Sequence, residues 1–322
     1  MSYRVPDPNV WQGRKTGHSA YLHEKVVCTP IGELEKANGK AYALLGYASD
    51  EGVRRNLGRI GASVGPLEIR SRLAKLADHL QRSTQLYDAG DIACEGTDLE
   101  NSQQELSQAV TRILALGTFP VLLGGGHEIA YGHILGVWKY LQDQGEETSL
   151  GIINLDAHFD LRTFEGRSTS GTPFYQVAQK FKEAGTPFHY FCLGIEPLSN
   201  SAALYDTANE LNARYIENTD FHLGNMDEVM ETLKAFAQQV DHLYLTIDMD
   251  GFSAAFAPGV SAPSPLGFEP RMAMEVIRFI IQTGKLISID IAELNPKYDV
   301  DGRTARLAAQ LVAQIMLLLD RD

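Results

Sequence analysis

The chain has 322 residues, of which 44% are hydrophobic and 21% are charged, a composition typical of globular proteins. Its formal charge of −13 at pH 7 would repel phosphate backbones, so nucleic acid is not an expected partner. The three cysteines, Cys28, Cys94 and Cys192, form no CxxC pair, which argues against a disulfide framework and against thiolate-bound zinc. The polar N-terminus lacks the apolar core of a signal peptide, and no apolar run could span a bilayer. We therefore expect a cytoplasmic protein with no membrane partner.

Residues 1–40 have weak periodicity and predict an N-terminal arm, whereas residues 41–322 are expected to form a single domain. Within that domain, apolar runs of strand length alternate with amphipathic stretches of helix length. The expected strands are Ala43–Tyr47, Pro120–Gly124, Leu150–Asp156, His189–Ile195, Arg214–Ile216, His242–Asp248 and Lys285–Ile291. The expected helices lie near 66–80, 100–117, 128–143, 174–184, 198–210, 226–239, 269–283 and 304–319.

Continuous apolar strands such as GIINL and LYLTI indicate a parallel sheet that is covered on both faces. Alternating strands and helices over this length predict the α/β class, with a doubly wound three-layer α/β/α architecture. In such sheets ligands bind beyond the carboxyl ends of the strands. The residues that follow the strands are therefore the candidates for chemistry.

Acidic and imidazole side chains follow two of the expected strands. One strand runs into Asp-Ala-His-Phe-Asp, which places Asp156, His158 and Asp160 at alternate positions, and another ends in Asp-Met-Asp, with Asp248 and Asp250. Period-two spacing points the side chains of each set to the same side. A single aspartate at a strand end is usually a cap or turn residue, but capping does not explain both sets together.

A glycine run, GGGHE, follows a third strand and puts His127 at the opening of the next helix. The run lacks the Lys-Ser/Thr of a P-loop and the spacing of GxGxxG, no GxSxG occurs elsewhere, and HEIAY is not HExxH. The remaining interpretation is close backbone approach beside a metal-binding His127. Two divalent ions would offset the four aspartates and lower the pKa of a shared water. Oxygen and imidazole ligands without thiolate favour Mn²⁺ over zinc.

Four segments in this order resemble the motifs of the arginase–agmatinase–formimidoylglutamase family: GGGHE (124–128), NLDAHFDLR (154–162), LTIDMDGF (245–252) and SIDIAELNP (288–296). The resemblance covers roughly residues 40–320. It implies a three-layer α/β/α fold with an eight-stranded, mostly parallel sheet and two Mn²⁺ ions per chain.

The resemblance also implies a role for each matching residue. One metal would be held by His127, Asp156, Asp160 and Asp248, and the other by Asp156, His158, Asp248 and Asp250. Glu293 matches the glutamate that binds the cationic amidine or guanidine of the substrate.

Two departures favour the formimidoylglutamase branch of the family. Arginases and agmatinases carry a histidine in the loop after DAHxD, where this chain has Ser170, and their DxDxxDP motif is altered here to DMDGFSA. Arg162 directly after DAHFDL, the N-terminal WQGR and the segment DEGVRRNLGRIGASVGP are also similar to formimidoylglutamases. A substrate with two carboxylates needs arginines, which pair with carboxylates bidentately. The candidates are Arg162 first, and then Arg54, Arg55, Arg59 and Arg70.

We thus expect a homo-oligomeric hydrolase that acts on a small molecule, N-formimidoyl-L-glutamate, with Asp160 and Glu293 as catalytic residues. Asp160 would move the proton, and Glu293 would hold the amidinium over the metals. An alternative substrate is another guanidino or amidino compound such as agmatine, guanidinobutyrate or arginine. From a different class, the chain could be a noncatalytic metal-binding or ligand-binding relative.

Overall fold

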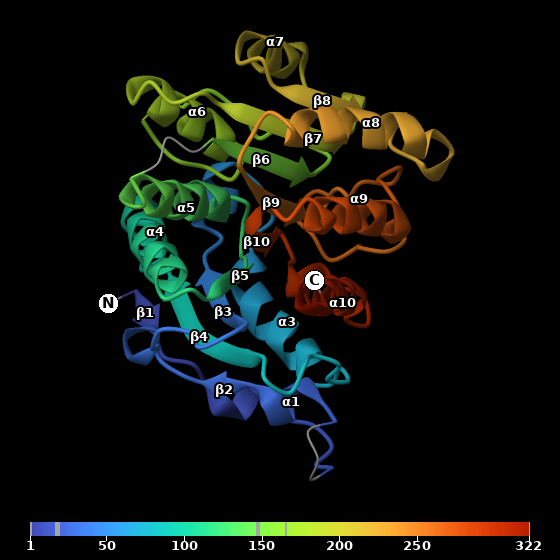
Figure 1. Ribbon diagram of the computed structural model, residues 1–322. Helices are drawn as coiled ribbons and strands as arrows, with labels where there is room; N and C mark the ends of the chain where they lie inside the picture. The colour runs from blue at the N-terminus through green and yellow to red at the C-terminus, as the bar shows by residue number, and fades with distance from the viewer. Residues whose placement is uncertain (1, 17–19, 146–148, 165, 322) are drawn as a thin grey trace.

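A computed structural model describes residues 2–16, 20–145, 149–164 and 166–321 of the chain. Figure 1 shows a central twisted sheet with helices on both sides. The strands are β1 (Tyr3–Arg4), β2 (Val27–Cys28), β3 (Ala41–Ala48), β4 (Gln85–Ala93), β5 (Phe119–Leu123), β6 (Leu150–Leu155), β7 (His189–Ile195), β8 (Arg214–Glu217), β9 (His242–Asp248) and β10 (Leu286–Ala292). The α-helices are α1 (Leu22–Lys25), α2 (Glu51–Arg55), α3 (Gly65–Leu73), α4 (Leu99–Ala115), α5 (Ile129–Asp143), α6 (Pro173–Glu183), α7 (Ala202–Glu210), α8 (Met226–Ala237), α9 (Pro270–Gln282) and α10 (Arg303–Arg321).

The body of the sheet consists of eight strands in the order β4-β3-β5-β10-β9-β6-β7-β8, and each neighbouring pair is parallel. This confirms the predicted three-layer α/β architecture. Two strands of two residues each, β1 and β2, come from the N-terminal 40 residues and pair with β4, β1 in the antiparallel direction. Within the described residues the sheet therefore has ten strands.

The side chains of each strand alternate between two hydrophobic cores. On β6, Ile153 and Leu155 join the core under α3, α8, α9 and α10, whereas Leu150 and Ile152 join the core under α4, α5, α6 and α7. Figure 1 shows the same two groups of helices on opposite sides of the sheet. Because both faces are buried, the strands need apolar residues at consecutive positions, which is the pattern that predicted a parallel sheet.

Most of the predicted elements lie within two or three residues of the observed ones, with three corrections. The helix expected at 66–80 ends at Leu73, and the one expected from 198 begins at Ala202 after a 3₁₀ turn, Pro197–Ser199. The eighth strand of the body, β4, was not predicted. Its sequence, QLYDAGDIA, carries Asp88 and Asp91 among its apolar residues, which hides the strand pattern.

The two aspartates of β4 are tied into buried contacts. Arg70 of α3 donates to Asp88 (Nη2–Oδ1, 2.9 Å) and to Asp91 (Nη1–Oδ1, 2.6 Å). Trp11 of the N-terminal WQGR segment donates from Nε1 to Asp88 (2.8 Å). Paired in this way, the carboxylates avoid the cost of burying an unpartnered charge. The cluster anchors the N-terminal segment to the sheet.

Candidate metal centre

The predicted metal ligands meet at the carboxyl ends of four neighbouring strands. In the sheet, β5, β10, β9 and β6 lie side by side. His127 follows β5, Asp248 ends β9, Glu293 follows β10, and the DAHFD segment from Asp156 to Asp160 follows β6. Parallel strands that end at the same edge bring together residues that are up to 166 positions apart in the sequence.

Three aspartates surround one nitrogen of His127. The Nδ1 atom lies 2.9 Å from an Oδ2 of Asp160, 3.0 Å from Asp248 and 3.1 Å from Asp156. These four side chains form one group that could hold a metal ion. Its members are the four ligands that the family resemblance implies for the first metal.

A second group shares Asp156 and contains His158 and Asp250. The Nδ1 atom of His158 lies 3.3 Å from Asp250 Oδ1 and 3.5 Å from Asp156 Oδ1. The sequence also expects Asp248 in this set, but its carboxylate joins only the first group. Asp156 is therefore the residue that the geometry places between two candidate ions.

The backbone is bent where it presents these ligands. Asp160 has φ of +49° and Glu293 has φ of +64°, in the left-handed region that costs most residues about 1–3 kcal/mol. The glycine run lies against the ends of the neighbouring strands. A Cβ on Gly125 would lie 1.8 Å from the Ser49 carbonyl oxygen, and a Cβ on Gly124 would lie 2.5 Å from that of Ile291. The run thus makes the close backbone approach expected beside His127.

A buried hydrogen-bond chain behind His127 fixes the orientation of its ring. Nε2 lies 3.0 Å from the hydroxyl of Thr246 on β9, and that hydroxyl lies 2.5 Å from Asp290 Oδ1 on β10. Asp290 also contacts His133 (2.6 Å) and the hydroxyl of Tyr244. The Thr246 hydroxyl has one proton, which it donates to Asp290 Oδ1. Thr246 therefore accepts from His127 Nε2–H, which leaves the Nδ1 lone pair for a metal.

Glu293 presents a free oxygen to the pocket. Its Oε1 accepts from the backbone N–H of His127 (2.8 Å), and its backbone N–H donates to Gly125 (2.8 Å). Oε2 is buried and has no hydrogen-bond partner among the described residues. Burial, followed by the charges of Asp248 and Asp250, raises the pKa of the Glu293 carboxyl well above its usual value. Such an oxygen suits a cationic group brought in by a ligand.

Without a cation, several ionisable groups of the centre have raised pKa values. Burial, reinforced by Asp156, raises the pKa of Asp160 from 3.8 to about 6. Burial, with the charge of Asp248, also raises the pKa of Asp250 well above its usual value. Burial opposes the charged form of His127, yet the carboxylates of Asp156, Asp160 and Asp248 close to Nδ1 raise its pKa well above 6.5. Clustered carboxylates thus need positive charge, which protons or divalent cations can supply.

The donor set fits divalent cations by its unpartnered atoms as well as by its chemistry. His127 Nδ1 and Asp250 Oδ1 are buried, face the two groups, and make no hydrogen bond of good geometry within the described residues. Buried polar atoms without partners are rare in native proteins unless an ion or water satisfies them. All the donors are carboxylate oxygen or imidazole nitrogen, ligands that suit manganese.

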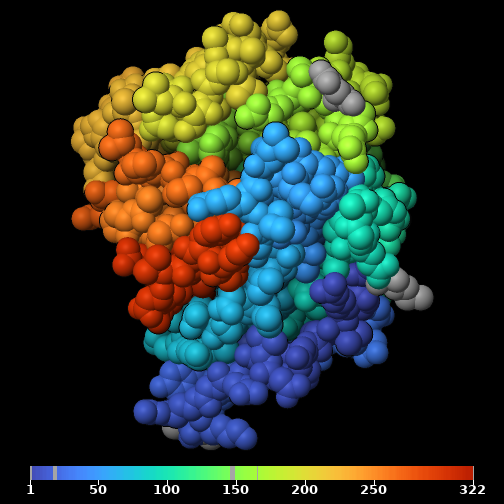
Figure 2. All heavy atoms as spheres, turned by 180° about the vertical axis from the view of Figure 1, so that it is seen from behind, coloured from blue at the N-terminus to red at the C-terminus, as the bar shows by residue number. Residues whose placement is uncertain are grey.

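A pocket of about 340 Å³ opens beside the centre. It is lined by the metal-site residues His158, Asp160, Asp248 and Asp250, by Glu293, and by residues that include Val53, Asn56, Arg59, Arg162, Ser170 and Asn200. Figure 2 shows the light-blue segment that includes part of this lining between yellow-green and orange segments of the chain. Its volume suits a small molecule rather than a polymer.

The arginines proposed from the sequence have different environments. Arg70 lies in the buried β4 cluster, and Arg54 and Arg55 bind Glu51, so these three lie outside the pocket lining. Arg59 lines the pocket, but its guanidinium binds the carbonyl oxygens of Val260 and Ser261. Arg162 lines the pocket, and its guanidinium has no hydrogen bond or ion pair within the described part of the chain. Arg162 is therefore the arginine best placed to bind a ligand.

Comparisons with known proteins agree with this site. The family model described as the arginase family matches residues 40–318. The chain belongs to the arginase family. It is 44% identical to the formimidoylglutamase of Geobacillus sp. (strain WCH70), over 99% of this chain and 97% of that protein. It is 42% identical to the formimidoylglutamase of Aeromonas salmonicida, over 95% of this chain and 96% of that protein.

Solved structures of arginase-family proteins share the fold. The formimidoylglutamase of Bacillus subtilis has a TM-score of 0.80 at 24% identity and covers 96% of this chain and 94% of its own. Trypanosoma cruzi formiminoglutamase, solved with Mn²⁺₂, has a TM-score of 0.75 at 24% identity and covers 91% of this chain and 98% of its own. Among the described residues, no helix is long and apolar enough to cross a membrane.

Sequence reasoning missed the residues behind the ligands. Thr246 and Asp290 lie inside the quoted motifs LTIDMDGF and SIDIAELNP, but their contacts with His127 depend on the pairing of β9 with β10. His133, on α5, was not singled out from the sequence. The sequence did hold a signal for these residues. Thr246, Ser288 and Asp290 are polar, yet they lie in apolar strands whose side chains are buried on both faces of the sheet.

Proposed function

We propose that this chain hydrolyses N-formimidoyl-L-glutamate to L-glutamate and formamide. The observation that carries the proposal is the guanidinium of Arg162, which has no hydrogen bond or ion pair among the described residues and lines the same pocket as the ligand cluster and Glu293. The pocket thus offers a cation for a substrate carboxylate and a carboxylate for a substrate amidinium. The identity of 38–44% to proteins named formimidoylglutamase supports this choice of substrate.

Two Mn²⁺ ions per chain complete the proposed site. His127, Asp156, Asp160 and Asp248 would hold one ion. Asp156, His158 and Asp250 would hold the other. The family resemblance implies Asp248 as a further ligand of this second ion. The ions would supply Lewis acidity, lowering the pKa of a water held between them and balancing the four carboxylates.

The protein's own side chains would position the substrate and move the proton. Glu293 Oε2, which has no hydrogen-bond partner among the described residues, would bind the formimidoyl amidinium and hold its carbon over the centre. Asp160, which lines the pocket and has a raised pKa, would accept a proton from the attacking water. The new bond joins the water oxygen to the formimidoyl carbon. The bond from that carbon to the glutamate nitrogen then breaks, and Asp160 returns the proton to the departing amine.

Selectivity would come from Arg162 and Ser170 in the lining of the pocket. Arg162 would bind a carboxylate of the glutamate moiety and repel a ligand such as agmatine, which carries an ammonium in that place. Ser170, which is buried and lines the pocket, stands where arginases and agmatinases carry a histidine. Its small hydroxyl leaves room for a carboxylate-bearing substrate.

The experiment is a side-by-side assay of the purified, manganese-loaded protein on formimidoylglutamate, arginine, agmatine and guanidinobutyrate. We expect kcat/KM for formimidoylglutamate to exceed that for each of the other three by at least about 100-fold, the scale of a buried charge left without a partner. A preference for any guanidino compound would refute the proposed substrate. Absence of turnover on all four, with metal bound, would favour the noncatalytic alternative.

A further inference from the structure

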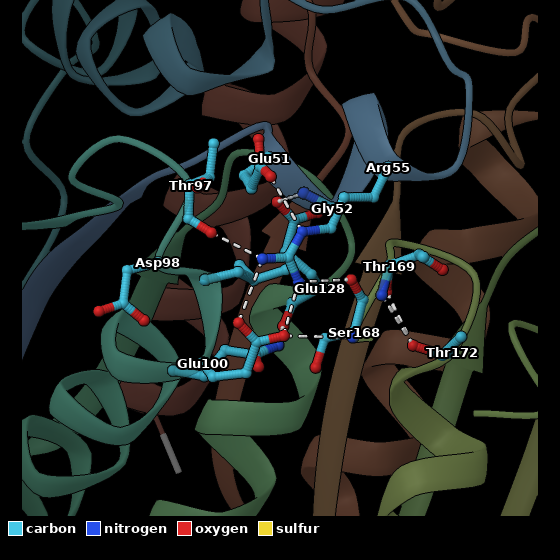
Figure 3. Close-up of polar contacts among 12 residues, drawn as sticks. Glu51, Gly52, Arg55, Thr97, Asp98, Glu100, Glu128, Ser168, Thr169 and Thr172 are labelled. Atoms are coloured by element: carbon cyan, nitrogen blue, oxygen red, sulfur yellow. Dashed lines mark hydrogen bonds and ion pairs between the residues drawn. The ribbon is translucent and has the colours of Figure 1, made fainter. Parts of the chain in front are cut away.

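The side chain of Arg55, at the end of α2, joins three separate segments of the chain (Figure 3). Its Nε donates to Glu51 on the same helix (2.9 Å), and its Nη2 donates to the carbonyl of Thr97 (2.6 Å). Nη1 donates to Glu100 at the start of α4 (2.6 Å) and to the carbonyl of Ser168 (3.0 Å). The side chain is only 8% exposed. A planar guanidinium can satisfy so many acceptors at once, and an ammonium cannot.

Glu100 also binds Ser168, through the backbone N–H. Its Oε1 accepts from the backbone N–H of Ser168 (3.3 Å), so Arg55 and Glu100 together bind both backbone polar groups of Ser168. The Ser168 hydroxyl accepts from Gln176 of α6 (2.9 Å). Ser168 is 1% exposed. The Arg55–Glu100 pair thus fixes Ser168 against α2 and α4.

Ser168 is followed directly by residues that shape the pocket. Thr169 and Thr172 bind each other, and Thr169 Oγ1 accepts from the N–H of Gly171. The carbonyl of Gly171 accepts from the N–H of Arg162 (2.9 Å). A Cβ on Gly171 would lie 2.9 Å from Cδ of Arg162, so this glycine lies directly beside the Arg162 side chain. Residues 168–172 thereby set where Arg162 and Ser170 stand.

Arg55 itself belongs to α2, which forms another part of the pocket wall. α2 and the residues that follow it provide Val53, Asn56 and Arg59 to the pocket lining, whereas Arg55 lies behind the wall and does not line it. We propose that Arg55 is a positioning residue for substrate recognition: its guanidinium, together with Glu100, ties the α2 wall of the pocket to the segment that carries Arg162 and Ser170. This role rests on the proposed function, because it acts through the pocket that would bind the glutamate moiety.

The test compares Arg55→Lys with a matched control on the same helix, Arg54→Met. Arg54 also binds Glu51 (2.6 Å), but its side chain is 51% exposed and makes no hydrogen bond or ion pair with the described residues 166–172. In the manganese-loaded enzyme, Arg55→Lys should raise KM for formimidoylglutamate and weaken L-glutamate binding about tenfold or more. The manganese content should be unchanged and kcat should stay within about threefold of wild type. Arg54→Met should match wild type in every measurement.

Glu100→Gln should reproduce the effect of Arg55→Lys, and the double variant should be less than additive, since both residues act on Ser168. Hydrogen exchange supplies a readout that does not need a substrate: amides of residues 166–172 should exchange faster in Arg55→Lys than in Arg54→Met.

Unchanged exchange, KM and glutamate affinity in a folded Arg55→Lys protein would overturn the positioning role. Loss of manganese or of kcat at unchanged KM would overturn it too, because the Arg55–Glu100 pair would then act on the metal centre. If wild type does not turn over formimidoylglutamate, the proposed function fails, and the exchange comparison still decides whether Arg55 holds the segment.

Discussion

Arg162 is the residue on which the proposed selectivity depends. Arg162→Ala should retain manganese and lower kcat/KM for formimidoylglutamate about 10–100-fold, the scale of one lost charge-assisted hydrogen bond of roughly 1.5–3 kcal/mol. Arg162→Lys should recover only part of the loss, because an ammonium cannot bind a carboxylate bidentately. Steady-state kinetics with metal analysis checks both. An unchanged kcat/KM in the folded alanine variant would remove Arg162 from substrate binding and direct attention to Arg59.

Thr246 is a second single-residue test, aimed at the metal rather than the substrate. Thr246→Val removes the hydroxyl that accepts from His127 Nε2 and bridges it to Asp290. We expect manganese affinity to fall about 10–100-fold, as for other residues that orient a metal ligand. Thr246→Ser keeps the hydroxyl and serves as the matched control. Calorimetric titration of chelator-treated protein measures both, and equal affinity of the valine variant and wild type would show that the hydrogen bond does not orient His127.

At the scale of the elements, the strand ends explain why the candidate site could be predicted from sequence. A ligand that follows an apolar strand lies at the carboxyl edge of a parallel sheet, so the DAHFD and DMD segments and His127 could be placed together without coordinates. The polar strand β4 and the short helix α2 could not be predicted in this way. β4 depends on Arg70 and Trp11 to neutralise Asp88, and α2, five residues long, is too short to show helical periodicity.

The roles of the arginines could not be predicted from the sequence pattern either. Arg54, Arg55 and Arg59 lie within six residues of one another. Nothing in their spacing shows which of them binds other protein groups and which could bind a substrate. Their roles depend on Glu51, Glu100 and the carbonyl oxygens of residues 260–261, which other elements bring to them. Tertiary contacts of single side chains, unlike strand ends, leave no periodic trace in the sequence.

For the whole molecule, the charge of the metal centre makes the free energy of unfolding depend on pH and on bound metal. In the metal-free fold, burial raises the pKa of Asp160 to about 6, and the pKa values of Asp250, Glu293, His127 and His158 are also raised. Groups with raised folded-state pKa values stabilise the fold below their unfolded pKa, and this contribution is lost as pH rises through the folded value. Chelator-treated protein should therefore become less stable between pH 5 and pH 8.

Manganese should reverse that loss, because the cations bind the ionised ligands. At 100 times its dissociation constant, an ion adds about 2.7 kcal/mol to stability, or roughly 5 °C in Tm. Thermal denaturation of loaded and chelated samples should show a gap that is larger at pH 8 than at pH 6. A gap that stays constant or shrinks as pH rises would contradict the assignment of these residues as metal ligands.

The measurement that tests the central claim most directly is a manganese titration of chelator-treated protein, followed by formimidoylglutamate turnover at saturating substrate. Because two ligand groups share Asp156, activity should depend on both ions and reach its plateau at two equivalents of manganese per chain. A plateau at one equivalent would contradict the two-ion centre. Full turnover in the chelated protein would contradict a role for metal altogether.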